Sequence, residues 1–257
     1  MKKRKIVAFL AAGICGVSAL VGFSGCTSFL NPADYEQWST NIASKTMLSA
    51  VLVEKINYAT GEKGMGSGMI FYESDTHYYA LTNNHVVHKS VGEVSVGYEA
   101  IDCYDNAYMS AKVEYAAADY DLAVVSFQKK GDVDLEVTGL AWKNATTLQQ
   151  IALISNPKGR HNATTFGRVS RYDKIELGNS SVAESNVTFS VMAHDCFSLD
   201  GSSGGAIINE SLEIVAVHYA CGYAEDGSFV EGYAVPVEKV REFLVTAETV
   251  TGKELGV

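Results

Sequence analysis

The sequence predicts an all-β protein: two six-stranded antiparallel β-barrels followed by a C-terminal helix. Its 257 residues include 23 Gly but only 3 Pro, with 14 Tyr and many Val, Ile and Thr in short runs. This composition favours strands joined by Gly-containing turns. The runs fall into two similar sets on either side of a polar link at residues 129–134, and a stretch with helical spacing follows the second set.

The first set of runs predicts a barrel within residues 46–130. Each run is short, rich in β-branched or aromatic residues, and bounded by Gly or polar turn residues. The expected strands are 47–53, 68–72, 78–82, 93–97, 111–115 and 122–127. Six such strands are enough to close a small antiparallel barrel.

The second set predicts a barrel within residues 135–236 and a helix that closes it. The expected strands are 150–154, 164–171, 186–193, 205–208, 213–218 and 231–235. Apolar side chains then recur at helical spacing at Val237, Val240, Phe243 and Leu244, which predicts a closing helix over 237–247. Residues 46–247 thus form one expected domain, and 248–257 a tail.

The first 25 residues have the layout of a secretory signal peptide, because basic residues 2–5 precede an uncharged apolar stretch. Residues 23–26, Phe-Ser-Gly-Cys, resemble a bacterial lipobox, in which the Cys is lipidated and becomes the mature N-terminus. We therefore expect a signal peptide at 1–25, lipidation of Cys26 that anchors the chain to a membrane of the bacterial envelope, and a tether or short helix at 26–45. The alternatives are an ordinary cleaved signal and an uncleaved anchor, since about 20 apolar residues can span a bilayer.

The mature chain is strongly acidic. Of the 20 Lys and Arg residues, four lie in the signal peptide, which holds no acid, so 16 basic and 30 acidic residues remain, a formal charge of −14. This charge argues against a nucleic-acid partner. His88 follows His85 by three residues, but on an expected strand end and with no second pair at ligand spacing. We therefore expect no metal and no cofactor.

Four cysteines remain beyond the signal peptide: Cys26, Cys103, Cys196 and Cys221. If Cys26 is lipidated, the other three cannot all pair within the chain. An exported protein can keep a disulfide, and Cys196 with Cys221 is the best candidate because they flank the serine loop considered below. The alternative is two buried free thiols.

Three local signals indicate chemistry when they are taken together. The first is His85, at the end of an expected strand in Ala-Leu-Thr-Asn-Asn-His, where an imidazole can serve as a general base near neutral pH. The second is Asp121, directly before the buried run Leu-Ala-Val-Val, where a carboxylate can orient that histidine. We prefer it to Asp119, which lies further from the strand. Alone, each is more readily interpreted as a structural histidine or a solvated turn residue.

The third signal is the run Asp-Gly-Ser-Ser-Gly-Gly at residues 200–205. Small residues let the backbone approach a substrate carbonyl, and Gly permits the dihedral angles that aim N–H groups at one point. Ser203 is the expected nucleophile, preferred to Ser202 because two glycines follow it. The amides of Gly201 and Ser203 are the expected oxyanion hole. A Gly/Ser loop on its own is more often a plain turn.

The order His, Asp, Ser, with Thr-Asn-Asn-His, Asp-Leu-Ala-Val and Gly-Ser-Ser-Gly-Gly, resembles the bacterial trypsin-like peptidases, particularly the HtrA/DegP-type protease domain. The resemblance covers residues 46–240 and includes Gly-Ser-Gly at 66–68 and Asn-Pro-Lys-Gly at 156–159. It implies a chymotrypsin-like fold with the site between two barrels, and a serine endopeptidase acting on proteins or peptides through His85, Asp121 and Ser203. Only 54 residues follow Ser203, so we expect no PDZ domain of the HtrA kind.

The expected specificity pocket has the strand 214–222 as one wall, with His218, Tyr219 and Ala220, and it has Phe197 and Ser198 near its base. His218 stands where the glutamyl endopeptidases have a histidine that recognises an acidic side chain, which would suit cleavage after Glu. The alternative is that His218 only packs beside a pocket for small apolar residues.

Two other functions compete with peptidase activity. A catalytically silent binding lipoprotein on the same fold is the first, although every triad position is intact in this sequence. The second is an esterase, because Gly-Ser-Ser-Gly-Gly matches the nucleophile-elbow pattern. That fold places Asp and His after the Ser, whereas here both precede it, so chain order excludes it.

Overall fold

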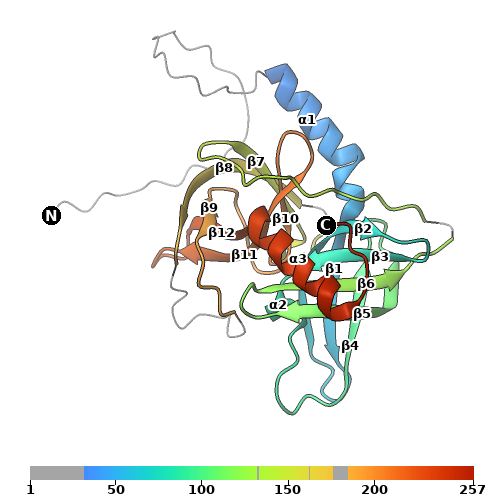
Figure 1. Ribbon diagram of the computed structural model, residues 1–257. Coiled ribbons are helices and arrows are strands. Elements are labelled where there is room, and N and C mark those ends of the chain that lie inside the picture. The colour runs from blue at the N-terminus through green and yellow to red at the C-terminus, as the bar shows by residue number, and fades with distance from the viewer. Residues whose placement is uncertain (1–31, 132, 162, 176–184) are drawn as a thin grey trace, which may run out of the picture.

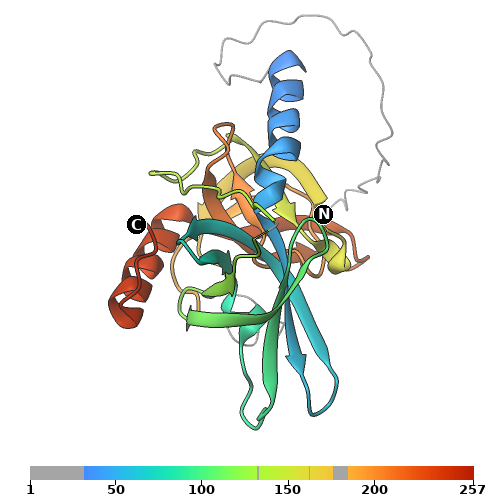
Figure 2. The same cartoon turned by 90° about the vertical axis from the view of Figure 1, so that its right-hand side faces the viewer.

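The computed structural model describes residues 32–131, 133–161, 163–175 and 185–257. Two closed antiparallel barrels of six strands each lie side by side in it, with a helix after the second (Figures 1 and 2). The fold class predicted from the sequence is therefore confirmed.

The first barrel has the strand order β1-β2-β3-β6-β5-β4. Its strands are β1 (Ala50–Asn57), β2 (Lys63–Glu73), β3 (His77–Thr82), β4 (Val96–Ile101), β5 (Ala107–Ala117) and β6 (Leu122–Gln128). β2 and β5 begin earlier than predicted, whereas β1 and β4 each begin three residues later. Residues Thr46–Ser49 form a short 3-10 helix, η1, in which the Leu48 N–H donates to the Lys45 carbonyl. β4 begins at Val96 and not at 93, because the Glu93 carboxylate turns back to accept from Lys55 and from the Ser90 N–H.

The second barrel has the order β10-β11-β12-β9-β8-β7. Its strands are β7 (Gln150–Ser155), β8 (Ala163–Asp173), β9 (Val191–His194), β10 (Ala206–Ile208), β11 (Ile214–Tyr223) and β12 (Phe229–Pro236). β9 is shorter than the predicted 186–193, since the Asn186 N–H donates to the Ala118 carbonyl of the first barrel and not to a neighbouring strand. Between β7 and β8 a 3-10 turn, η2 (Pro157–Gly159), reaches toward the first barrel and contacts β2.

A shared core holds the barrels together. One cluster of buried side chains includes Met69 and Leu81 from the first barrel with Ile154 and Val217 from the second. Helix α3 (Val237–Thr251) joins this cluster and runs four residues beyond the predicted end at 247. Its Phe243 ring lies 5.4 Å from that of Tyr115 on β5, so the helix that follows the second barrel also packs on the first.

Helix α1 (Pro32–Ser44) leads into the first barrel, and the ring of its Trp38 packs 5.3 Å from that of Phe166 on β8 of the second. Trp38 and Ile42 are buried, and the Trp38 indole donates to the Asn209 carbonyl at 3.2 Å. The start of the helix projects away from both barrels (Figure 2). Residues 1–25, predicted to be a signal peptide, and Cys26 lie outside the described residues. No helix among the described residues is long and apolar enough to cross a membrane.

Candidate active site

His85 and Asp121 form a direct pair within the first barrel. His85 lies on a one-turn helix, α2 (Asn84–Val87), directly after β3, where the sequence predicted a strand end. Its Nδ1 is 2.8 Å from Asp121 Oδ2, and its backbone N–H donates to Asp121 Oδ1 at 3.0 Å. The carboxylate is fully buried. Because an ionised carboxylate only accepts, Nδ1 carries the proton and Nε2 is left as a base.

A tight turn aims Asp121 at this histidine. The Asp121 N–H donates to the Ala118 carbonyl, and φ of Asp121 is 50°, a left-handed value that an Asp tolerates better than most residues. The Asn83 side chain secures the turn by donating to the Asp121 carbonyl at 2.8 Å. Asp119, the other candidate, is exposed on the same turn.

The serine loop meets α2 at Gly66 on β2. A Cβ built on Gly66 would lie 2.6 Å from the Val86 side chain and 2.9 Å from the Ser203 carbonyl. Val86, which follows His85, and the backbone of Ser203 therefore both lie against Gly66. Ser203 is half-buried, whereas the Ser202 hydroxyl is buried and accepts from the Leu199 N–H at 3.2 Å. Of the two serines, only Ser203 is partly open to solvent.

Two glycines give the loop its shape. Gly201 has φ +90° and Gly204 has φ +85°, both values that favour Gly. A Cβ on Gly204 would collide with the Ser67 carbonyl. The close approach of the loop to β2 therefore requires Gly at 204.

Hydrogen bonds orient two peptide groups of this loop. The Asp200 carbonyl accepts from the Lys158 N–H of η2 at 2.7 Å, and the Ser202 carbonyl accepts from the Gly205 N–H at 2.9 Å. In a trans peptide the N–H points opposite the carbonyl, so the N–H groups of Gly201 and Ser203 point away from these acceptors. Within the described part of the chain neither N–H has an acceptor. Both remain available for an oxygen ligand.

The expected pocket residue His218 is paired with a second histidine that sequence reasoning missed. His218 Nδ1 lies 3.1 Å from His194 Nε2, and both rings are buried. Burial lowers the pKa of His218 well below its ordinary value, and the neighbouring His194 and His85 add to this. Burial likewise lowers the pKa of His194 to about 3, against a small opposing effect of Glu231. Both rings are neutral near pH 7.

The other expected pocket residues divide into two groups. Ser198 is buried and its hydroxyl has no hydrogen-bond partner among the described residues, while Phe197 is half exposed and packs edge-on to Phe229 at 5.4 Å. Tyr219 and Ala220 instead bury their side chains in the shared core, where the ladder between β11 and β12 is irregular.

The predicted disulfide between Cys196 and Cys221 is wrong: both thiols are free. Cys221 on β11 pairs with Gly232 on β12, which pairs with His194 on β9. Two strand spacings, about 10 Å, therefore separate Cys221 from His194, two residues before Cys196. A disulfide needs Cα atoms within about 7 Å. Cys196 instead contacts the Ile151 carbonyl, Cys221 the Tyr223 hydroxyl, and Cys103 is also free.

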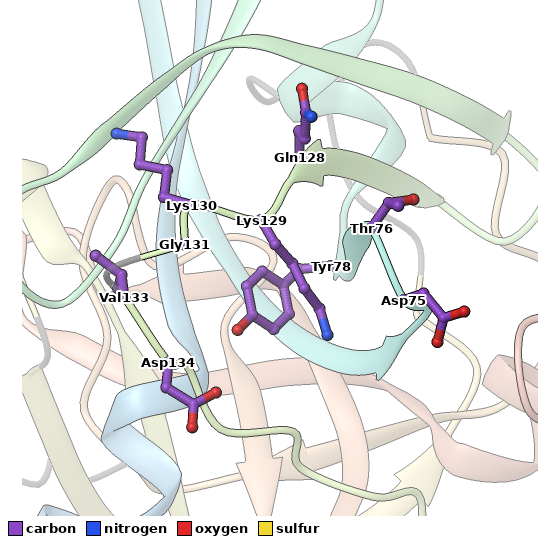
Figure 3. A pocket seen from close by; sticks show the side chains of 9 residues that line it. All are labelled: Asp75, Thr76, Tyr78, Gln128, Lys129, Lys130, Gly131, Val133 and Asp134. Carbon is purple, nitrogen blue, oxygen red and sulfur yellow. The ribbon is translucent and has the colours of Figure 1, made fainter.

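A separate hollow lies at the far end of β3 and β6 (Figure 3). Lys129 crosses it, with its amine 4.9 Å from the centre of the Tyr78 ring and 2.7 Å from Glu73. None of the predicted site residues lines this hollow. Among the described residues no cluster of three or more His, Cys, Asp or Glu is arranged to hold a metal ion.

Comparison with known proteins finds relatives that are named as serine proteases. The serine protease Do-like HtrA of Bacillus subtilis is 29% identical over 186 residues, which are 70% of this chain and 38% of that protein. The periplasmic pH-dependent serine endoprotease DegQ of Escherichia coli is 27% identical over 182 residues, 70% of this chain and 36% of DegQ. The chain thus spans under two fifths of the length of these two relatives.

The fold is also found among solved structures. The active form of the Rv3671c protease of M. tuberculosis superposes with a TM-score of 0.67 at 18% identity, covering 93% of this chain and 97% of that one. The family model described as the trypsin-like peptidase domain matches residues 66–217, which hold His85, Asp121 and Ser203. The chain therefore belongs to the trypsin-like peptidase domain family.

Proposed function

We propose that the protein is an exported, lipid-anchored serine endopeptidase with Ser203 as nucleophile, His85 as general base and Asp121 as the group that orients it. The observation that carries the proposal is the 2.8 Å contact between His85 Nδ1 and the buried Asp121 carboxylate, beside a serine loop in a trypsin-like fold. The relatives from Bacillus subtilis and Escherichia coli are both named as serine proteases, which supports the same reaction class.

The reaction follows from the orientation of these groups. Ser203 Oγ attacks the carbonyl carbon of a peptide bond while His85 Nε2 takes its proton, and Asp121 stabilises the imidazolium. The N–H groups of Gly201 and Ser203 donate to the oxygen anion that forms. His85 then gives its proton to the leaving amine, which breaks the peptide bond and leaves an acyl-enzyme. Water hydrolyses this ester by the same two proton transfers.

Cleavage after Glu is our proposal for specificity. The buried Ser198 hydroxyl lacks a partner within the described part of the chain, and burial lowers the pKa of His218 so that it carries no charge. A substrate carboxylate between them would satisfy the first and favour protonation of the second. The alternative is cleavage after small apolar residues, with His218 serving only in packing.

Export with a lipid anchor is supported by the signal-like residues 1–25 and the lipobox-like residues 23–26. DegQ, by its name, is a periplasmic enzyme. Mass spectrometry of the N-terminal peptide from cell membranes tests the anchor: we expect a lipidated Cys26, and in Cys26→Ser we expect loss of the lipid. An unmodified Cys26 in the mature protein would exclude this part of the proposal.

The main test uses the full-length chain with casein, beside a Ser203→Ala variant and a matched Ser202→Ala variant. We expect cleavage by the wild type, loss in Ser203→Ala and labelling of Ser203 by a fluorophosphonate. Sites clustered after Glu would support the His218 pocket, and sites after small apolar residues would reject it. A folded wild type that neither cleaves nor labels would favour the binding lipoprotein.

A further inference from the structure

We propose that Ser67 is a positioning residue of the serine loop: its hydroxyl holds the Gly201 peptide so that the free N–H groups of the loop face the substrate carbonyl. The inference rests on the proposed function, because it assigns Ser67 a part in the same reaction. Ser67 is fully buried on β2 of the first barrel, and the loop that it contacts lies 134 residues later in the second barrel.

The Ser67 hydroxyl joins two segments of the second barrel. Its Oγ donates to the Gly201 carbonyl at 2.7 Å and accepts from the Asn156 N–H at 2.7 Å. Asn156 leads into η2, the turn whose Lys158 N–H holds the Asp200 carbonyl. A hydroxyl has one donor and can accept as well, and here both capacities are used. The loop and its supporting turn are thus joined through one side chain.

The backbone of Ser67 contacts the same loop a second time. Its N–H donates to the Ser203 carbonyl at 2.7 Å, and its own carbonyl accepts from the buried Thr82 hydroxyl at 2.7 Å. Ser67 therefore holds the carbonyl groups of Gly201 and Ser203, on both sides of Ser202. The backbone contact would survive removal of the hydroxyl, so a substitution at 67 removes only the two contacts of the hydroxyl, with the Gly201 carbonyl and with the Asn156 N–H.

Loss of the Ser67 hydroxyl would remove a hydrogen bond from the peptide group between Gly201 and Ser202. The peptide between Gly201 and Ser202 is held at its N–H by the Leu199 carbonyl and at its carbonyl by Ser67. Gly201 lacks a Cβ, so sterics alone do not fix its dihedral angles. Without Ser67 Oγ the Gly201 carbonyl and the Asn156 N–H would each lose a hydrogen bond. The Gly201–Ser202 peptide and the η2 turn, whose Lys158 N–H orients the Asp200–Gly201 peptide, would both be freer to shift, so the Gly201 N–H would no longer be held toward the substrate. The reaction would lose oxyanion stabilisation, while substrate binding would stay.

The test compares the full-length wild type with Ser67→Ala, with Ser67→Cys, which keeps the size but has a weaker donor, and with Ser49→Ala as a matched control. Ser49 is equally buried and its hydroxyl pairs with Thr138, a residue outside the loop, at 2.8 Å. The assays are kcat and KM on a peptide substrate, and inhibition by a peptide aldehyde and by the matching peptide alcohol. The aldehyde adduct needs the oxyanion hole, whereas the alcohol does not.

For Ser67→Ala we expect kcat to fall about 10- to 100-fold, a part of the loss that follows removal of an oxyanion donor, with KM within about 3-fold. Aldehyde inhibition should weaken in parallel and alcohol inhibition should not. The kcat of Ser67→Cys should lie between those of the wild type and Ser67→Ala. Ser49→Ala should have a lower thermal stability but the wild-type kcat.

Two results would overturn the inference. One is a folded Ser67→Ala, or Ser67→Cys if the Ala variant does not fold, with the wild-type kcat. The other is an equal weakening of alcohol and aldehyde, which would indicate a collapsed pocket. Either result leaves the proposed function standing as long as the wild type cleaves and Ser203→Ala does not.

Discussion

At the scale of single residues, the proposed orientation of His85 depends on the buried carboxylate of Asp121. It is fully buried, while Asp119 on the same turn is exposed. We expect Asp121→Asn to lower kcat by about 10³–10⁴-fold, because an amide no longer selects the tautomer with the proton on Nδ1. Steady-state kinetics on a peptide substrate measures this. Asp119→Asn is the matched control and should stay near wild type, and the reverse ranking would move the orienting role to Asp119.

The paired histidines in the second barrel make stability depend on pH. Burial holds the pKa of His194 at about 3, below its ordinary 6.5, so the unfolded chain takes up a proton that the folded chain excludes. This contribution is complete above pH 6.5 and is lost as the pH falls toward 3. Gln does not titrate, so the Tm values of wild type and His194→Gln in thermal unfolding should converge as the pH falls over that range. A constant difference in Tm from pH 7 to 4 would contradict the assignment.

At the scale of elements, a buried carboxylate connects the C-terminal segment to the first barrel. Burial acts to raise the pKa of Glu114 on β5, but hydrogen bonds from Lys253, Ser126 and Lys112 outweigh it and hold the pKa at about 2. A lowered pKa stabilises the fold above the unfolded value of 4.5, and this stabilisation is lost as the pH falls from 4.5 to 2. In thermal melts over this range, the Tm of Glu114→Gln should lie below that of the wild type at pH 5 and approach it near pH 2. Glu242→Gln, in an exposed pair with Lys239, should change little.

The sequence predicts where the strands lie, but it does not predict which residues the sheets bring together. Alternating and β-branched runs located all twelve strands, because strand formation depends largely on the residues of the strand itself. The disulfide failed because it depended on how β11, β12 and β9 lie beside one another, which no local pattern records. His194 was missed for the same reason: a lone histidine in a strand becomes informative only when the sheet brings it to His218. Ser67, inside a Gly-Ser-Gly motif, could have been singled out as the one polar side chain in a buried stretch.

At the scale of the whole molecule, the shared core leads us to expect that the two barrels unfold as one cooperative unit. Phe243 is fully buried in the cluster that holds residues of both barrels. We expect Phe243→Ala to cost about 3–5 kcal/mol of the free energy of unfolding and to leave a single transition in calorimetry. Val245→Ala, on the exposed face of the same helix, should be nearly neutral. Two separate transitions in either variant would show that the barrels unfold independently.

The contact between Ser67 and Gly201 has a consequence for synthesis. The two residues are 134 positions apart, so a chain emerging from the ribosome carries β2 long before the serine loop exists. Contacts of such long range form slowly, and the loop has no partner for its Gly201 carbonyl until both barrels are complete. The geometry of the proposed active site is therefore among the last features that the chain acquires, and a fragment that lacks the first barrel has the serine without the support of Ser67 for its loop.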